Sequence, residues 1–291
     1  MKEITILSGK GGTGKTSITA GLATLAQQTV FCDNDVDAAD LFLIFKPVIK
    51  EEHVFEGSWI VQIDDEKCTN CGICKNYCRF DAIHYKNLGS LEINPQQCEG
   101  CRLCERVCPS AAIISKRSTN NFWYVSDTRF GKMVHAEMGP GEENSGKLVT
   151  EIRKRSKEIA QEINTSFIIN DGPPGIGCAA ISSLSGTQVA LIVIEPSKSG
   201  LHDAKRLVEL IHTFNIDMFA IINKYDINLG MSKEIKTFLT SENIQLLAEL
   251  PFDIKMVEAM IESKSIVEYA PDSKTSQLLK NVWENLETIK T

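Results

Sequence analysis

The chain has 291 residues, of which 43% are hydrophobic and 24% are charged, and its formal net charge is −7. This composition is typical of a globular protein with one large core, or with a core and a smaller second unit. The longest apolar runs, such as 189–194, have the length of a strand, and no basic segment followed by an apolar one opens the chain, so we expect a cytoplasmic protein without a membrane span. The negative charge argues against a general affinity for nucleic acid or anionic lipid.

The first predicted elements are a strand over 3–8, a glycine-rich loop and a helix over 15–28, in which Ile18, Leu22 and Leu25 have helical spacing. The loop matches the pattern G-x4-G-K-[ST]. Its backbone N–H groups surround phosphate oxygens, Lys15 reaches the β and γ phosphates, and Thr16 offers a hydroxyl to Mg²⁺. The predicted nucleotide-binding residues of the loop are Gly9, Lys10, Gly11, Gly12, Thr13, Gly14, Lys15, Thr16 and Ser17.

Aspartates follow two of the predicted strands. The strand over 30–35 runs into the sequence DNDVDAAD, and a later strand ends at Asp171. Hydrolysis of a nucleotide needs carboxylates that order Mg²⁺ and the attacking water. We predict this role for Asp35 and Asp171, whereas Asp37 and Asp40 are equally well explained as solvated turn residues.

Eight of the ten cysteines lie in one stretch that repeats C-x2-C-x2-C-x3-C, with the second run starting 30 residues after the first (98 − 68). Zinc sites and disulfides are the alternatives, but this spacing is typical of bacterial ferredoxins with two [4Fe–4S] clusters. In such proteins the fourth cysteine of each run ligates the other cluster. The predicted ligand sets are Cys68, Cys71, Cys74 and Cys108 for one cluster, and Cys98, Cys101, Cys104 and Cys78 for the other.

Beyond the cysteines the sequence alternates helices and strands, which indicates a parallel sheet with helices on both faces. The expected elements are a helix over 145–163, a strand over 167–175, a strand over 189–196, a helix over 201–214 and a strand over 218–226. We predict an α/β fold with a mostly parallel, doubly wound P-loop sheet formed by 1–58 and 117–291, and an inserted α+β ferredoxin-type domain over 59–116. A terminal helix that contains Leu279, Trp283 and Leu286 on one face should pack on the core.

These motifs resemble the deviant Walker A ATPases, the group of MinD, ParA, Mrp and the nitrogenase iron protein. The similar segments are KGGTGKT, the D-x-D after the second strand and DGPPG at Asp171. The inserted repeat resembles the branch of MinD-superfamily ATPases that carries an inserted ferredoxin domain, and the resemblance covers essentially the whole chain. It implies that Lys10 crosses a dimer interface to the phosphates of the partner subunit, that Asp35 acts in switch I and that Asp171 acts in switch II. Asp40 departs from the family pattern, which usually has Asn there.

The identity of the base depends on weaker signals. The segment 223–226 reads NKYD, the N-K-x-D pattern in which the acid of GTPases binds guanine, but a plain strand end explains Asp226 equally well. The resemblance instead implies ATP, with Asn223 near the base and Pro251 in the loop on its other side.

Two cysteines lie outside the repeat. A buried thiol is a sufficient explanation for Cys32. Cys178 lies seven residues after Asp171, which is the offset of a cluster ligand in the nitrogenase iron protein, but Asn144 occupies the place of the second ligand. A bridging cluster would therefore lack ligands, so we expect a packed thiol at Cys178, with a redox role as the alternative.

Three functions are consistent with these observations. We predict an ATPase that acts as a homodimer, or as a heterodimer with a paralogue, and that couples ATP and Mg²⁺ binding to electron transfer through two [4Fe–4S] clusters to an unknown partner. The alternatives are an iron–sulfur carrier or assembly ATPase of the Mrp type and a positioning ATPase like MinD or ParA. Mrp-like carriers use a C-x-x-C near the chain end, and no cysteine follows Cys178. The eight complete ligands argue against a positioning ATPase with vestigial clusters.

Overall fold

The computed structural model describes residues 1–86, 89–139, 141–142 and 144–289. The chain divides into two compact units. The first consists of Met1–His53, Trp123–Glu137 and Ser145–Thr291, and the second consists of Val54–Phe122 and Met138–Asn144. The chain therefore passes from the first unit to the second after His53 and again after Glu137, and returns each time.

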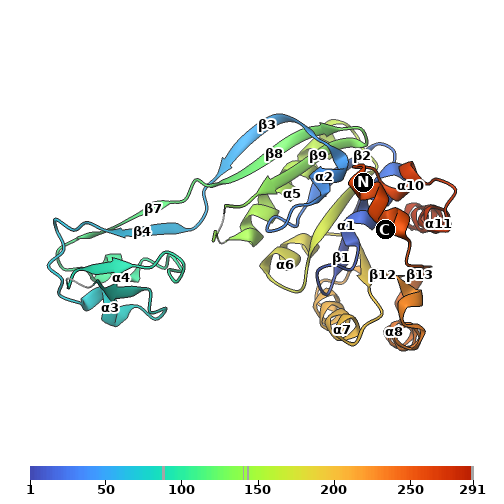
Figure 1. The fold of residues 1–291 in the computed structure, drawn as a ribbon. Coiled ribbons are helices and arrows are strands. Elements are labelled where there is room, and N and C mark those ends of the chain that lie inside the picture. The colour runs from blue at the N-terminus through green and yellow to red at the C-terminus, as the bar shows by residue number, and fades with distance from the viewer. Residues whose placement is uncertain (87–88, 140, 143, 290–291) are drawn as a thin grey trace. The chain divides into compact units, whose positions relative to one another are not determined.

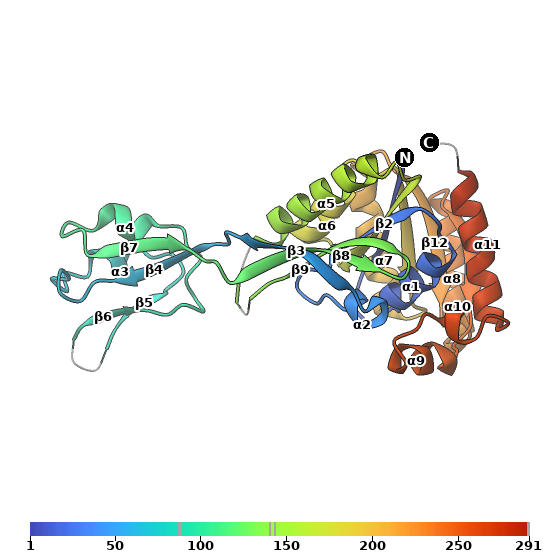
Figure 2. The same ribbon diagram turned by 90° about the horizontal axis from the view of Figure 1, so that it is seen from above.

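A nine-stranded sheet lies at the centre of the first unit, with helices on both faces (Figures 1 and 2). The six pairings from β13 across to β9 are parallel, which confirms the predicted α/β fold with a mostly parallel sheet. In spatial order the strands are β13 (Gln245–Leu250), β12 (Asp217–Asn223), β11 (Val189–Ile194), β1 (Lys2–Ser8), β10 (Phe167–Pro174), β2 (Thr29–Asp33), β9 (Gly131–Glu137), β8 (Asn121–Thr128) and β3 (Val48–Phe55).

The central strands are apolar on both faces because helices cover both faces. In β11, Leu191 and Val193 belong to one cluster of buried side chains, whereas Ile192 and Ile194 belong to another, since successive side chains of a strand point in opposite directions. The helices of the first cluster are α1 (Lys15–Leu25), α2 (Leu41–Phe45), α10 (Ile266–Tyr269) and α11 (Lys274–Thr288). Those of the second are α6 (Cys178–Leu184), α7 (Lys198–His212) and α8 (Leu229–Ser241).

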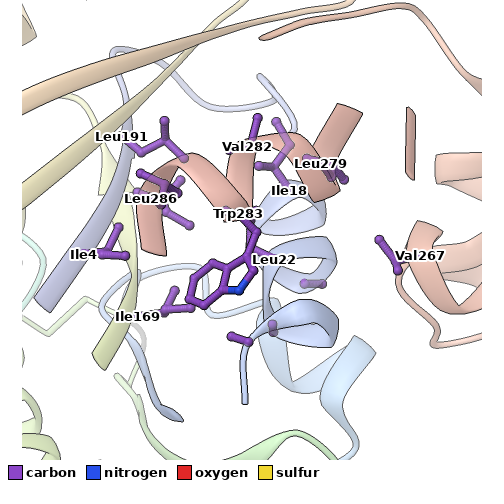
Figure 3. Close-up of a cluster of buried hydrophobic side chains, with 14 of the residues drawn as sticks. Ile4, Ile18, Leu22, Ile169, Leu191, Val267, Leu279, Val282, Trp283 and Leu286 are labelled. Carbon is purple, nitrogen blue, oxygen red and sulfur yellow. The ribbon is translucent and has the colours of Figure 1, made fainter. Parts of the chain in front are cut away.

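The terminal helix α11 packs its apolar face on the core, as predicted. Figure 3 shows Trp283 and Leu286 of this helix among Leu22 of α1 and Ile4 of β1, and all four side chains are buried. The ring of Trp283 also lies edge-on to Phe167, with centroids 5.1 Å apart. Within the described residues, no helix combines the length and the apolar character that crossing a membrane requires.

The remaining elements of the first unit are a long helix that packs on β2, β9 and β10, two short helices, and the strands beyond β2. α5 (Ser145–Glu162) lies beside α6, where Arg153 donates a hydrogen bond to the carbonyl of Ser185 at 2.8 Å (Figures 1 and 2). A short 3₁₀ helix (Tyr225–Ile227) follows β12, and α9 (Ile254–Ile261) follows β13. Neither β3, β8 nor β9 was predicted. They extend the sheet beyond β2, and β8 and β9 form a hairpin whose turn contains Arg129 and Phe130.

The second unit repeats one backbone pattern. Its strands are β4 (Trp59–Ile63), β5 (Ile83–Tyr85), β6 (Leu91–Ile93) and β7 (Ile113–Arg117), and its helices are α3 (Ile73–Tyr77) and α4 (Leu103–Val107). β4 pairs with β7 and β5 with β6, both antiparallel. Residues with positive φ recur 30 positions apart, at Asn70 and Gly100, Gly72 and Arg102, and Asp81 and Ala111. The backbone therefore has the internal symmetry that the cysteine spacing predicted.

Candidate functional site

A cavity of about 430 Å³ opens above the glycine-rich loop of the first unit. Of the predicted site residues, it is lined by Gly11, Gly12, Thr13, Gly14, Lys15, Thr16, Ser17, Asp35, Asn223 and Pro251. It lies beyond the carboxyl ends of β1, β2, β12 and β13, where parallel sheets commonly bind ligands. Gly9, Lys10 and Asp171 are not among the lining residues.

Two glycines of the loop are required by close approaches. Gly14 precedes α1 with φ of 90°, and a Cβ atom there would lie 2.4 Å from Nδ2 of Asn223. A Cβ atom on Gly9 would lie 2.5 Å from a backbone carbon of Asp203 in α7. Side chains at these positions would push the loop away from its neighbours, so the glycines keep its N–H groups at the start of α1.

The charged centre of the site is the contact between Lys15 and Asp171. Lys15 Nζ lies 3.1 Å from Asp171 Oδ1 and 3.7 Å from Asp35 Oδ2. Asp171 also accepts hydrogen bonds of 2.8 Å from the hydroxyls of Thr16 and Thr19. Burial disfavours the charge of Lys15, but the neighbouring carboxylates outweigh it and raise its pKa. The loop lysine, the loop threonine and both predicted aspartates are therefore brought together, and Thr19 joins them without having been predicted.

Two further carboxyl groups border this centre. Asp33 is fully buried at the end of β2 and accepts hydrogen bonds from the backbone N–H groups of Asp35 at 3.2 Å and Leu41 at 3.3 Å. Burial and the nearby Asp171 raise its pKa well above the usual range. Burial also raises the pKa of Asp35, to about 6. Asp33 thus connects the loop that carries Asp35 to the start of α2.

The raised pKa of Asp35 predicts a pH dependence of stability. The folded chain holds this proton more tightly than the unfolded chain, so the contribution to stability is complete below pH about 4 and is lost as the pH rises through about 6. The Asp35→Asn variant cannot ionise at this position. Without nucleotide or Mg²⁺, we therefore expect the melting temperature of the variant to rise relative to that of the wild type as the pH increases from about 4 to about 6. Differential scanning fluorimetry measures both temperatures. A melting-temperature difference that stays constant across the window would contradict the burial of a proton at Asp35.

Lys10 is directed to a neighbouring loop and not into the cavity. Its Nζ lies 2.9 Å from Glu195 Oε2 and donates hydrogen bonds to the hydroxyls of Ser197 at 3.2 Å and Ser199 at 3.4 Å. Glu195 also lies 3.6 Å from Nζ of Lys224. Partial burial opposes the ionisation of Glu195, but the two lysines hold its pKa below the usual range. Glu195 was not predicted from the sequence, because no local motif marks it.

The NKYD segment supports the loops around the cavity. Asn223 donates a hydrogen bond of 2.7 Å to the carbonyl of Thr13, so it supports the phosphate-binding loop directly. Asp226 is not among the lining residues, and its Oδ1 accepts a hydrogen bond of 2.7 Å from the N–H of Phe252. That contact engages one oxygen of the carboxylate on which recognition of guanine would depend.

The cavity has an apolar wall that was not predicted from the sequence. It is formed by Phe252, Met256, Val257 and Met260, from the loop after β13 and from α9. Phe252, Val257 and Met260 are exposed. The spacing of 256, 257 and 260 on one helical face was the signal available in the sequence. An apolar surface beside Pro251 suits the face of a purine base.

The eight cysteines of the repeat line two cavities of the second unit, four in each. One is lined by Cys68, Cys71, Cys74 and Cys108, and the other by Cys78, Cys98, Cys101 and Cys104. Apolar side chains such as Val61, Ile83 and Ile113 surround the thiols. The N–H of Ala112 donates a hydrogen bond of 3.3 Å to the sulfur of Cys108. Each cavity combines three cysteines of one run with the fourth of the other.

None of the cysteines forms a disulfide. Among the described residues, no three His, Cys, Asp or Glu side chains have the arrangement of a site for a single metal ion. Cys32 is buried, as expected, and burial raises its pKa to about 12. Cys178 is exposed at the start of α6, so the expectation of a packed thiol was wrong there. It is the first residue of this short helix, directly after the loop that ends at Gly177.

Comparison with known proteins identifies relatives that match most of the chain and one that matches a part of it. Residues 4–266 match the family described as the CobQ/CobB/MinD/ParA nucleotide binding domain. The uncharacterized protein MJ0578 of Methanocaldococcus jannaschii is 34% identical over 290 residues, which cover 98% of this chain and 96% of the relative. The iron-sulfur cluster carrier protein of Aquifex aeolicus is 24% identical over 140 residues, or 43% of this chain and 38% of the carrier. The structure of MinD from Pyrococcus horikoshii with Mg-ADP shares the fold, with a TM-score of 0.61 and 20% identity over 99% of this chain and 96% of that one.

Proposed function

The chain belongs to the CobQ/CobB/MinD/ParA nucleotide-binding family. We propose that it is an iron–sulfur ATPase, in which ATP binding and hydrolysis in a dimer control electron transfer to a partner protein. The observation that supports the proposal most is the pair of cavities lined by four cysteines each, in a unit separate from the one that holds the phosphate-binding loop. The proposed division is an ATPase domain over 1–58 and 117–291 and a ferredoxin-type domain over 59–116.

The nucleotide proposed for the first cavity is ATP with Mg²⁺. Lys15 would hold the β and γ phosphates, and Thr16 and Asp35 carry the oxygen donors that Mg²⁺ prefers. Asp171 accepts hydrogen bonds from Thr16 and Thr19, so it orients the hydroxyl that would face the metal. ATP is proposed over GTP because Asp226 does not line the cavity and its Oδ1 accepts a hydrogen bond from the N–H of Phe252. The apolar wall would stack on either purine and does not discriminate between them.

The groups proposed for the second unit are two [4Fe–4S] clusters, which supply one-electron transfer when bound. The four cysteine thiols of each cavity fit a four-iron cubane, because each iron of such a cluster takes one thiolate. The four thiols therefore surround the cluster and need not point at a single metal ion. This geometry is consistent with four thiols around each cavity and with the lack of a single-ion site among the described residues. Apolar side chains pack beside the thiols, and the N–H of Ala112 would stabilise the negative charge of a Cys108 thiolate.

The alternative is an iron–sulfur carrier of the Mrp type. The partial similarity to the carrier of Aquifex aeolicus favours it, but that similarity covers only 43% of this chain. A carrier and an electron-transfer protein differ in what leaves the protein. Iron leaves with a transferred cluster, whereas electron transfer leaves the iron content unchanged.

The test measures iron and electrons in anaerobically purified protein. We expect about eight irons per chain, in clusters that dithionite reduces. With an extract of the source organism as the acceptor, ATP should accelerate reoxidation more than a non-hydrolysable analogue does. Half of that iron or less after full reconstitution, or zinc in its place, would contradict the cluster assignment. Iron lost to an apo-acceptor at the rate of reoxidation would favour the carrier.

A further inference from the structure

We propose that Arg129 is the positioning residue through which the nucleotide cavity acts on the β8–β9 hairpin. This inference rests on the proposed function, because the hairpin would transmit the effect of nucleotide binding toward the second unit. Arg129 lies in the turn of the hairpin, and its guanidinium uses five N–H donors. Nε and Nη2 donate to the carboxylate of Glu268 at 2.7 and 2.8 Å. Nη1 donates to the carbonyls of Ile44 at 2.8 Å and Phe45 at 3.1 Å. Nη2 also donates to the carbonyl of Ser263 at 3.1 Å.

One set of these contacts leads to switch I. Ile44 and Phe45 are the last residues of α2, and the first residue of α2, Leu41, donates its N–H to the buried carboxylate of Asp33. The turn also contacts α2 through Phe130, whose ring centroid lies 4.8 Å from that of Phe45. α2 thus joins Arg129 to the strand end that carries the switch I aspartates.

The other set leads to the apolar wall. Ser263 follows α9, which contributes Met256, Val257 and Met260 to the cavity. Glu268 belongs to α10 and forms a reciprocal cap with Ser265, whose hydroxyl lies 2.6 Å from that of Thr24 in α1. The guanidinium therefore contacts segments that border the cavity at switch I and at α9.

The hairpin itself is continuous with the second unit. β8 starts at Asn121, where the second unit ends at Phe122, and β9 ends at Glu137, just before the second unit resumes at Met138. Movement of α2 or α9 when a nucleotide binds would change the contacts of Arg129. This change would make local opening of β8 and β9, the two strands that lead to the second unit, more or less frequent. A planar fork that binds one carboxylate and three carbonyls cannot be replaced by the single ammonium group of lysine.

The experiment is hydrogen–deuterium exchange with and without a non-hydrolysable ATP analogue and Mg²⁺, on wild type, Arg129→Lys and Glu268→Gln. In the wild type, the analogue should slow exchange in both α1 and the β8–β9 hairpin. In Arg129→Lys, the protection of α1 and the analogue affinity should stay within about twofold, while the protection of the hairpin is lost. Glu268→Gln keeps the reciprocal cap, because Gln also fits it, but weakens the fork, so hairpin protection should be reduced. Arg206→Lys, at an exposed position of α7, is the matched control and should behave as wild type.

The inference is overturned if the hairpin of the wild type does not respond to the analogue, or if Arg129→Lys and Glu268→Gln both respond as the wild type does. The Glu268→Gln variant keeps the test decisive if Arg129→Lys does not fold. Failure of the proposed function is a separate result. In that case the hairpin would respond through Arg129, but cluster reoxidation would not depend on ATP.

Discussion

Lys10→Ala is expected to bind ATP almost as the wild type does and to lose both ATP hydrolysis and ATP-induced dimerisation. Lys15 and the loop N–H groups still hold the phosphates, whereas the side chain of Lys10 lies against Glu195 and outside its own cavity. A cation supplied by the partner subunit would offset charge on the transferring phosphoryl group, and we expect its loss to lower hydrolysis by about 10³-fold, as for an arginine finger. Equilibrium binding, a phosphate-release assay and light scattering measure the three properties.

The matched variant is Lys15→Ala, which should lose ATP binding itself. Lys15 lies in the cavity between Asp171 and Asp35, so its removal takes away the charge that faces the phosphates and leaves two carboxylates there. We expect no measurable ATP binding. Equal loss of binding in the two variants would contradict the separate roles of the lysines.

Mixing tests the role of Lys10 across the interface. In a heterodimer of Lys10→Ala and Asp35→Ala, one site keeps its own Asp35 and receives an intact Lys10 from the other chain. Hydrolysis should then partly return, although each variant alone is inactive. If Lys10 acted within its own chain, no site of the mixed dimer would be complete. Absence of rescue in mixtures shown to contain heterodimers would therefore refute the trans role.

Cys78→Ser should lower the iron content from about eight to about four per chain, because this cysteine lines the cavity of the second run. The ligand assignment can be tested through non-additivity. Combining Cys78→Ser with Cys101→Ser should remove little further iron, since both residues line the same cavity. Combining Cys78→Ser with Cys71→Ser should remove nearly all of it, since Cys71 lines the other cavity.

Cys178→Ser is the control for this series, because Cys178 is exposed and lies outside the repeat. It should retain the iron of the wild type, with unchanged electron paramagnetic resonance spectra after reduction. The opposite pattern, with additivity for Cys78 and Cys101 and none for Cys78 and Cys71, would show that each run binds its own cluster.

Local spacing explains what could be predicted from the sequence alone. The residues of the phosphate-binding loop are consecutive, and the C-x2-C-x2-C-x3-C runs have fixed short spacings, so both motifs could be recognised without a fold. The apolar strand 189–194 and the terminal helix were likewise recognisable, because one is buried on both faces and the other has one apolar face.

The contacts around the candidate site depend on the tertiary structure, because they join residues that are far apart in sequence. Arg129 contacts Ile44 and Glu268, Asn223 contacts Thr13, and Lys10 contacts Glu195, and no local pattern marks any of these partners. β3 has a mixed and largely exposed sequence at the edge of the sheet, so it lacks the apolar alternation of a half-buried strand. The environment of Asp35 was also not predictable, since its raised pKa comes from burial among residues that only the folded sheet brings together.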